Sequence, residues 1–324
     1  MAMPSKPLLI NRPGSGSGLG SNILSLAILT LIAKRHEYDV SVDWTERSLL
    51  KSKSANLFDV LFDISESELN ATISSSTNKI LSGLLVDNPT SLLEALINRE
   101  RVVIVSKCAG TAWLQPLGIN ENLLRAGFFI PLLSCFKHRI YSPNYQISLH
   151  IRHGKGEFLA DSAYFSRCTF LALFFPRILR FLIDIHLKSL SSEKKAKDDR
   201  VLTSDSSTIE DIFNKAGWST VPKKAVKAEW HQKIPKSPTS TIEGLEYQEA
   251  LNDISTLSKA DIILHNGSAL SYCAYLFSNS KTQFISLREL SLIIATTDKI
   301  FYVLLKIHSF LRQMSTRTKI SKVR

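Results

Sequence analysis

Cysteine is scarce in this chain, and its few copies form no metal-binding or disulfide pattern. Cys108, Cys135, Cys168 and Cys273 are widely separated, and no Cys-x-x-Cys pair or histidine cluster accompanies them. Zinc sites and disulfide frameworks need closely spaced ligands, so neither is predicted. The chain also has no Asp-x-Asp pair, so a carboxylate site for Mg²⁺ or Mn²⁺ is not evident. We therefore expect no bound metal and no cofactor.

Long apolar runs are missing as well. The apolar segment 127–136 is short, and the segment 169–183 is interrupted by proline and arginine, so no membrane-crossing helix is predicted. Residues 1–10 carry Lys6 but only a short apolar run after it, which predicts neither a signal peptide nor an anchor. We expect a cytoplasmic protein, with the inner membrane surface as one location for it.

The composition is that of a folded chain with excess positive charge. Hydrophobic residues make up 44% and charged residues 21% of the 324 residues, and this length favours two domains over a single core. Lys and Arg outnumber Asp and Glu by 40 to 29, which gives a formal net charge of +11. The charge predicts an anionic partner: a nucleotide sugar, a nucleic acid or an acidic membrane surface.

Short apolar runs alternate with helical patterns in two separate series. The expected strands are 7–11, 39–44 and 101–106 in the first series, and 147–152, 201–203, 261–264 and 283–287 in the second. Strands that alternate with helices form parallel sheets covered by helices, so we predict an α/β protein with two facing Rossmann-like domains and a ligand cleft between them. A helix is expected over 92–97 with a cap at Thr90 or Ser91, and loops over 46–86.

The expected division of the chain has three parts. An N-terminal Rossmann-like domain covers 1–140, a C-terminal ligand-binding domain covers 141–290, and a helix with a basic tail covers 291–324. The apolar segment 113–136 is predicted to be core or domain-interface packing. The segment 289–315 is a predicted helix with basic residues among Ile, Phe, Val and Leu, which either packs across the domains or presents an amphipathic surface to lipid.

The strand that opens the second series ends in a loop suited to an anion. Ile147, Leu149 and Ile151 alternate as in a buried strand, and the loop that follows contains Arg152, His153, Gly154, Lys155, Gly156 and Glu157. An open α/β sheet places ligands at the carboxyl ends of its strands. Arg152 offers a planar fork for a phosphate, and the two glycines let the backbone approach a ligand. The pattern predicts a diphosphate site, with a solvated turn as the alternative.

Four separated segments resemble one family of enzymes. Residues 18–27 with 42–44, 150–157, 201–205 and 257–274 are similar, in the same order, to motifs of the NodZ-like α-1,6-fucosyltransferase family. The segment 150–157 resembles the donor-binding motif of that family. The resemblance implies a two-domain GT-B-like glycosyltransferase that moves fucose from GDP-fucose to a glycan acceptor, with inversion and without a metal, and with the acceptor on the N-terminal domain.

The resemblance also implies the donor site. Its residues would be Arg152, His153, Gly154, Gly156, Asp205, Asn266 and Ser268. Arg152 would stabilise the negative charge that develops on the departing diphosphate. His153 stands where animal enzymes of the family have a second arginine, which leaves less positive charge here. Asp205 would bind hydroxyls or cap the next helix. Asn266 and Ser268 lie where a strand meets a helix, so they would bind phosphate, cap the helix, or both.

An inverting transfer needs a base for the acceptor hydroxyl, and two carboxylates are candidates. Glu157 is the first by position, with an exposed loop glutamate as the alternative, and Asp43 is the second. His150 faces the opposite side of its strand from Leu149, toward the cleft or into a partly buried site. Gly18 and Gly20 are expected in a loop on the acceptor side of the cleft.

Two other functions stay open at this stage. The glycine-rich loop 14–20 follows a strand, and Asp43 ends the next strand, as in an NAD-dependent oxidoreductase. However, the glycines alternate and do not give Gly-x-Gly-x-x-Gly in any register. A non-catalytic nucleotide-binding or anion-binding protein is the other alternative. No nucleic-acid-binding motif is visible, so no nucleic acid partner is expected, whereas peripheral membrane contact through the basic C-terminal segment is an open possibility.

Overall fold

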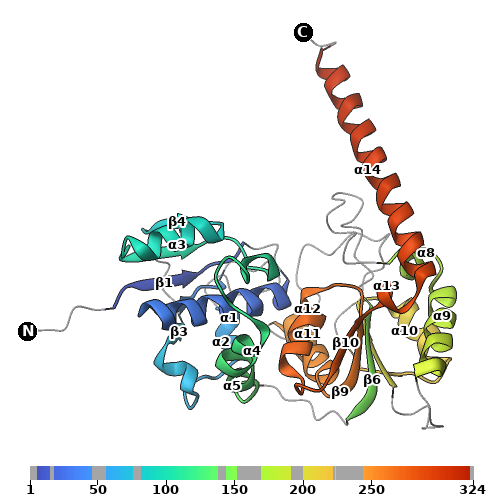
Figure 1. The fold of residues 1–324 in the computed structure, drawn as a ribbon, viewed down its shortest axis with the longest axis horizontal. Coiled ribbons are helices and arrows are strands. Elements are labelled where there is room, and N and C mark those ends of the chain that lie inside the picture. The colour runs from blue at the N-terminus through green and yellow to red at the C-terminus, as the bar shows by residue number, and fades with distance from the viewer. Residues whose placement is uncertain are drawn as a thin grey trace, which may run out of the picture.

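The computed structural model describes residues 6–14, 18–45, 56–75, 82–137, 144–151, 169–190, 200–221, 223 and 244–321. This part of the chain contains two five-stranded sheets, and every pair of neighbouring strands in them is parallel. Helices pack around both sheets (Figure 1). The predicted α/β architecture with two Rossmann-like sheets is confirmed.

The first sheet is built around the first strand of the chain. Its strands are β1 (Leu8–Asn11), β2 (Asp39–Val42), β3 (Ile73–Ser75), β4 (Leu84–Val86) and β5 (Val102–Val105), in the order β3-β2-β1-β5-β4. Leu9 and Ile10 in β1 are completely buried. Central strands of a parallel sheet are covered on both faces, which explains why β1 and β5 are continuous apolar runs.

The second sheet repeats this plan. Its strands are β6 (Tyr145–Ile151), β7 (Arg200–Ser204), β8 (Ser219–Thr220), β9 (Ala260–His265) and β10 (Gln283–Ser286), in the order β10-β9-β6-β7-β8. The chain moves outward from β6 to β8 and then returns to the other side of β6. The strand order therefore reverses between β6 and β9, and this is where such sheets open a ligand crevice.

The helices of the first half surround one long central helix. The elements are α1 (Leu19–His36), α2 (Leu57–Leu61), α3 (Pro89–Ile97), α4 (Glu121–Leu124) and α5 (Ile130–Leu133), with the short helical turns η1 (Glu68–Ala71), η2 (Thr111–Trp113) and η3 (Arg125–Phe129). Most of α1 is buried. Lys34, Arg35 and His36 lie in its last turn, where positive charge suits the helix dipole.

The structure corrects one expectation and confirms another in this half. The described part of 46–86 is not all loop, because it contains α2, η1, β3 and β4. Both strands have only three residues, so they carry too little periodicity to be recognised in the sequence. The apolar segment 113–136 is core as predicted, and Phe128 and Phe129 are completely buried.

The helices of the second half include the last and longest element. They are α8 (Phe170–Phe174), α9 (Pro176–Leu190), α10 (Ser207–Asn214), α11 (Leu245–Leu257), α12 (Ala269–Phe277), α13 (Leu287–Leu290) and α14 (Leu292–Ser321). The helix breaks between Phe174 and Pro176, because proline lacks the N–H of an interior position and is suited to the first turn of a new helix. Figure 1 shows α14 leaving the body of the molecule beside α8.

Helix α12 joins the two halves. It follows β9 in the second sheet, yet Cys273, Ala274 and Phe277 belong to the hydrophobic core that contains α1 and the first sheet. The Phe277 ring lies 4.8 Å from the ring of Phe129 and 5.4 Å from that of Phe136. Burial of these rings fixes the two sheets relative to each other, with α12 between them.

Candidate functional site

The carboxyl ends of β6 and β7 are tied together beside the point, between β6 and β9, where the strand order reverses. Ser204, the last residue of β7, donates a hydrogen bond from Oγ to the carbonyl of Ile151, the last residue of β6, at 2.9 Å. The Ser206 amide donates to the same Oγ at 3.2 Å. These two hydrogen bonds of Ser204 hold the ends of β6 and β7 side by side, and Arg152 directly follows Ile151 in the sequence.

On the other side of β6, the strand β9 leads into the start of α12. Ser268 caps this helix, since its Oγ accepts a hydrogen bond from the Ser271 amide at 3.1 Å. The same Oγ lies 2.9 Å from Nδ1 of His150 on β6, and both side chains are buried. Ser268 is therefore a cap, as one of the two predicted roles requires. The pair fixes the amino-terminal, partially positive end of α12 against the central strand of the sheet.

The turn from β9 into α12 is short and needs its glycine. Gly267 has φ 89°, a left-handed conformation that glycine adopts without strain. Its amide donates a hydrogen bond to Nδ1 of His265 at 3.0 Å. Asn266, predicted to contact the donor, is only 1% exposed. Its side chain is packed inside this turn rather than open on the surface.

His265 belongs to a stack of flat groups that the sequence did not reveal. Its ring lies 3.7 Å from the ring of Phe284 with an interplanar angle of 7°, and Phe284 stacks on Tyr275 at 4.6 Å. The guanidinium of Arg125, from the first half, lies 4.3 Å from the Tyr275 ring centre. Burial lowers the pKa of His265 to about 4, a change that Glu289 opposes and Arg288 assists. The imidazole is therefore neutral at pH 7 and stabilises the stack by packing.

A buried ion pair supports the end of β7. Lys223 Nζ lies 2.6 Å from Asp253 Oδ2 and donates to the Ser204 carbonyl at 2.8 Å. The two side chains are 9% and 7% exposed. Burial opposes the charge of Lys223, but Asp253, Glu210 and Asp205 outweigh it and raise the pKa of the lysine. Lys223 therefore carries a fixed positive charge close to the crevice.

Asp205 lies at the tip of β7, within the field of Lys223. The alternative of a capping role is wrong, because the cap of α10 is Ser206, whose side chain accepts from the Ile209 amide at 3.2 Å. Ser206 is completely buried, whereas Asp205 is partly exposed. The structure thus separates the capping residue Ser206 from its neighbour Asp205, which directly follows β7.

The first sheet places Asp43 in an ion pair. Arg12 Nε donates to Asp43 Oδ2 at 2.6 Å, and the Thr45 hydroxyl donates to Asp43 Oδ1 at 2.7 Å. The Asp43 side chain is 3% exposed. The sequence singled out Asp43 and not Arg12, which stands after β1. In this geometry the carboxylate fastens the loop after β2 to the loop after β1.

A buried polar network lies beside this ion pair. Trp44 Nε1 donates to Asn11 Oδ1 at 2.7 Å, and Asn11 Nδ2 donates to Ser25 Oγ at 2.9 Å. The Ala109 amide donates to the same Ser25 Oγ at 3.1 Å. The network connects β1, α1 and the segments that follow β2 and β5. Such satisfied buried networks hold loops in one arrangement.

Gly18 and Gly20 do not share one environment. Gly18 is the residue before α1, and a Cβ there would meet nothing within 4 Å. Gly20 lies inside the first turn of α1, and a Cβ there would come 2.6 Å from the Leu270 amide nitrogen. Cys273 also donates to the Gly20 carbonyl at 3.1 Å. Gly20 is thus required where α1 and α12 touch backbone to backbone.

The predicted residues Arg152, His153, Gly154, Gly156 and Glu157 lie outside the described residues, so their roles stay predictions. Within the described ranges, no group of three or more His, Cys, Asp or Glu side chains is arranged to hold a metal ion.

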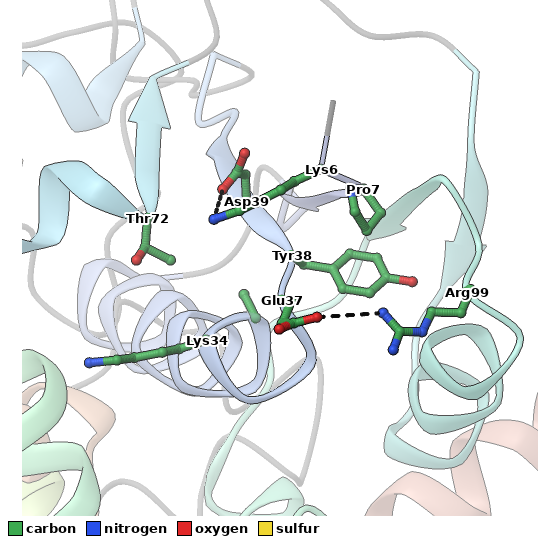
Figure 2. A pocket seen from close by; sticks show the side chains of 9 residues that line it. Lys6, Pro7, Lys34, Glu37, Tyr38, Asp39, Thr72 and Arg99 are labelled. Atoms are coloured by element: carbon green, nitrogen blue, oxygen red, sulfur yellow. Dashed lines mark ion pairs between the residues drawn. The ribbon is translucent and has the colours of Figure 1, made fainter. Parts of the chain in front are cut away.

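A hollow of about 490 Å³ lies at the opposite end of the first sheet (Figure 2). Its lining residues are Lys6, Pro7, Ala33, Lys34, Glu37, Tyr38, Asp39, Thr72 and Arg99. Two loose ion pairs cross it, Lys6 to Asp39 at 3.9 Å and Arg99 to Glu37 at 4.0 Å. The hollow borders the amino ends of β1, β2 and β3, which is not the edge where parallel sheets bind ligands.

Several solved structures share this fold. NodZ α-1,6-fucosyltransferase soaked with GDP-fucose matches with a TM-score of 0.52 and 18% identity, over 85% of this chain and 93% of that chain. Fucosyltransferase NodZ from Bradyrhizobium matches with a TM-score of 0.52 and 14% identity, over 85% and 94%. No protein-family model and no curated protein matches the sequence. The chain therefore has the two-sheet fold of NodZ, in agreement with the motif resemblance.

Proposed function

We propose that this protein is an inverting, metal-independent glycosyltransferase that moves fucose from GDP-fucose to a glycan acceptor. The observation that carries the proposal is the position of Ile151. It ends the central strand beside the reversal of strand order, where sheets of this kind bind ligands, and Arg152 follows it in the sequence. The shared fold with NodZ, one of whose crystals was soaked with GDP-fucose, supports this donor.

In this proposal the donor diphosphate binds between the 152–157 loop and the start of α12. The Arg152 guanidinium pairs with the phosphates in a bidentate manner, with His153 beside it. Gly154 and Gly156 let the backbone approach. The positive end of α12, held by the pair of Ser268 and His150, adds a second stabilising partial charge. Together these groups would stabilise the charge on the departing nucleotide without a metal.

Asp205 is proposed to orient the donor through hydroxyls. Its carboxylate stands at the tip of β7, is not used as a helix cap, and lies near the fixed charge of Lys223. A carboxylate in this position accepts hydrogen bonds from the ribose or from the sugar. Asn266 contributes indirectly, because its buried side chain shapes the turn that carries Ser268.

The base that deprotonates the acceptor hydroxyl is proposed to be Glu157. It belongs to the same loop as Arg152, so it would lie near the sugar carbon that reacts. Asp43 is the less suitable candidate, because Arg12 and Thr45 occupy both of its oxygens. The acceptor is proposed to bind on the first sheet, near Gly18, in the cytoplasm or at the inner membrane surface.

Two observations count against a dinucleotide-dependent oxidoreductase. Such an enzyme needs glycines that approach a pyrophosphate and a free carboxylate for the ribose. Here Gly20 is explained by its contact with the Leu270 backbone, and Asp43 is held by Arg12. The glycine and the acid that suggested NAD are thus used for packing and for loop fastening.

A thermal-shift titration tests the proposal. Ligands that bind the native state raise its stability by about 2.7 kcal/mol at a concentration of 100 times Kd. We expect GDP and GDP-fucose to raise the melting temperature equally with and without EDTA, and UDP and NADH to leave it unchanged. Transfer of fucose to a glycan, detected by mass spectrometry, is the decisive activity. A shift with NADH alone, or a GDP shift that EDTA abolishes, would contradict the proposal.

A further inference from the structure

The beginning of α14 is held by the body of the protein. Asp298 accepts from Arg288 Nε at 2.7 Å and from the Phe170 amide at 2.7 Å. Phe301 then packs on Phe170 with ring centres 4.8 Å apart, and Leu173 packs nearby. Beyond these contacts α14 projects away from both sheets (Figure 1). One face of its first half is therefore anchored, and the opposite face is left open.

The open face of α14 is apolar. Ile293, Ile300 and Ile307 follow one another at intervals of seven residues and are 54%, 57% and 51% exposed. Val303 and Leu304 lie between them and are about as exposed. A spacing of seven keeps side chains on one side of a helix. A continuous exposed apolar stripe of this kind marks a surface that contacts something else.

A second exposed apolar surface adjoins the base of α14. It is formed by Phe174, Phe175, Ile178, Phe181 and Ile185 of the α8–α9 region. The Phe174 ring lies 5.5 Å from that of Phe301, on the anchored face of α14, so this surface lies next to the first turns of that helix. Phenylalanine and isoleucine beside arginine, as in α9, are typical of helices that lie in the plane of a membrane surface.

Charge identifies the partner. Residues 299–324 contain Lys299, Lys306, Arg312, Arg317, Lys319, Lys322 and Arg324, and no Asp or Glu. Pairing with α14 of a second copy would bring two such basic segments together without acidic partners. An anionic lipid surface attracts the same charges while it buries the apolar stripe. None of the described helices is both long enough and apolar enough to cross a bilayer.

We propose that the apolar face of α14, with the adjoining α8–α9 surface, binds an anionic membrane surface. The stripe enters the boundary between headgroups and acyl chains, and Lys299 and Lys306 at its edges contact the headgroups. In this proposal, each of the two alternatives for the C-terminal segment holds for one part of it. The first turns of α14 pack on the body of the protein, and the open face of α14 contacts lipid. The proposal does not depend on the identity of the donor.

Co-sedimentation with vesicles tests it on the full chain. The protein should sediment with vesicles of phosphatidylcholine and phosphatidylglycerol, much less with phosphatidylcholine alone, and less as salt is added. The triple variant Ile300→Ser, Val303→Ser, Ile307→Ser should bind about tenfold more weakly. The matched control is Leu85→Ser with Ile97→Ser, two exposed apolar residues of the first half that are 65% and 74% exposed. This control should bind like the parent protein.

A second variant keeps the test independent of the apolar changes. Lys299→Glu with Lys306→Glu should also reduce binding to anionic vesicles several-fold, with the melting temperature preserved. The proposal is overturned if the triple variant binds anionic vesicles as well as the parent protein does. It is also overturned if the parent binds neutral and anionic vesicles equally, or binds neither kind. It is also overturned if the protein dimerises without lipid and the triple variant abolishes that dimer, since the stripe would then serve a second copy. Because GDP binding is measured separately, failure here leaves the proposed function intact.

Discussion

His150 Nδ1 and Ser268 Oγ lie 2.9 Å apart, which joins the central strand of the second sheet to the N-cap residue of α12. Both groups are buried, and Ser268 also caps the helix. The contact thus links three features in one place: the crevice end of β6, the positive end of α12, and the helix that packs into the first half of the protein. Changes here should affect stability and donor binding together.

Replacing Ser268 by Ala should therefore cost more than the loss of an ordinary cap. The cap alone is worth about 1 kcal/mol, and leaving the buried His150 nitrogen without this partner adds about 1–3 kcal/mol. Asn88→Ala is the matched control, because Asn88 caps α3 at an exposed position. Urea denaturation measures both variants. Equal losses of unfolding free energy would show that the contact with His150 contributes nothing.

Gly20 and Gly18 form a natural pair for a second experiment. Gly20→Ala would push a methyl group against the backbone of Leu270 at 2.6 Å, and we expect a loss of about 1–3 kcal/mol. Gly18→Ala meets nothing within 4 Å and should leave the stability within about 0.5 kcal/mol of the parent. Thermal unfolding of the two variants checks this. If Gly20→Ala left the stability unchanged, α1 and α12 would not be closely packed in solution.

The pair of Arg12 and Asp43 separates a fastening role from a catalytic one. Asp43→Asn and Arg12→Gln should each destabilise the protein by about 2–3 kcal/mol, because each leaves a mostly buried charge without its partner. The double variant should lose less than the sum, and urea denaturation gives this coupling energy. Fucose transfer should fall to a similar extent in both single variants. A collapse of kcat in Asp43→Asn alone, with stability retained, would instead identify Asp43 as the base.

Arg152→Ala should remove most transfer activity. Loss of one preorganised donor to a developing charge costs about 3 kcal/mol of transition-state stabilisation, or roughly two orders of magnitude in kcat. Arg99→Ala is the control, since its side chain is 70% exposed and lies at the distant hollow of the first sheet. Steady-state kinetics and the GDP-induced thermal shift measure the effect. Full activity in Arg152→Ala would exclude the diphosphate role of this residue.

The stability of the protein should decrease between pH 6.5 and pH 4. Burial lowers the pKa of His265 from 6.5 to about 4, so in this window the unfolded chain binds a proton that the folded protein does not. Acid therefore favours unfolding, by on the order of 2 kcal/mol for this partly exposed ring. His265→Gln should flatten the pH dependence in this window relative to the parent, as measured by urea denaturation at pH 4.5 and pH 7. If the unfolding free energy of the parent and of His265→Gln changed equally with pH, His265 would not be the source of this pH dependence.

Local patterns in the sequence predicted the strands that form the centres of the sheets. The apolar run within 101–106 corresponds to β5, and the alternation of Ile147, Leu149 and Ile151 corresponds to β6. The predicted start of α3 was wrong. Asn88 caps this helix ahead of Pro89, whereas Thr90 or Ser91 was expected, since several cap-forming residues stand close together there.

Other features depend on residues far apart in the chain, so no local pattern contains them. The sequence by itself determined that apolar and polar residues alternate as two parallel sheets require, and that charge gathers near the C-terminus. Only the tertiary structure decided that Arg12 reaches Asp43, that Lys223 reaches Asp253, and that α12 enters the core of the first half. Periodicity fixes which face of an element is buried, but which element covers that face is set by packing across the whole fold.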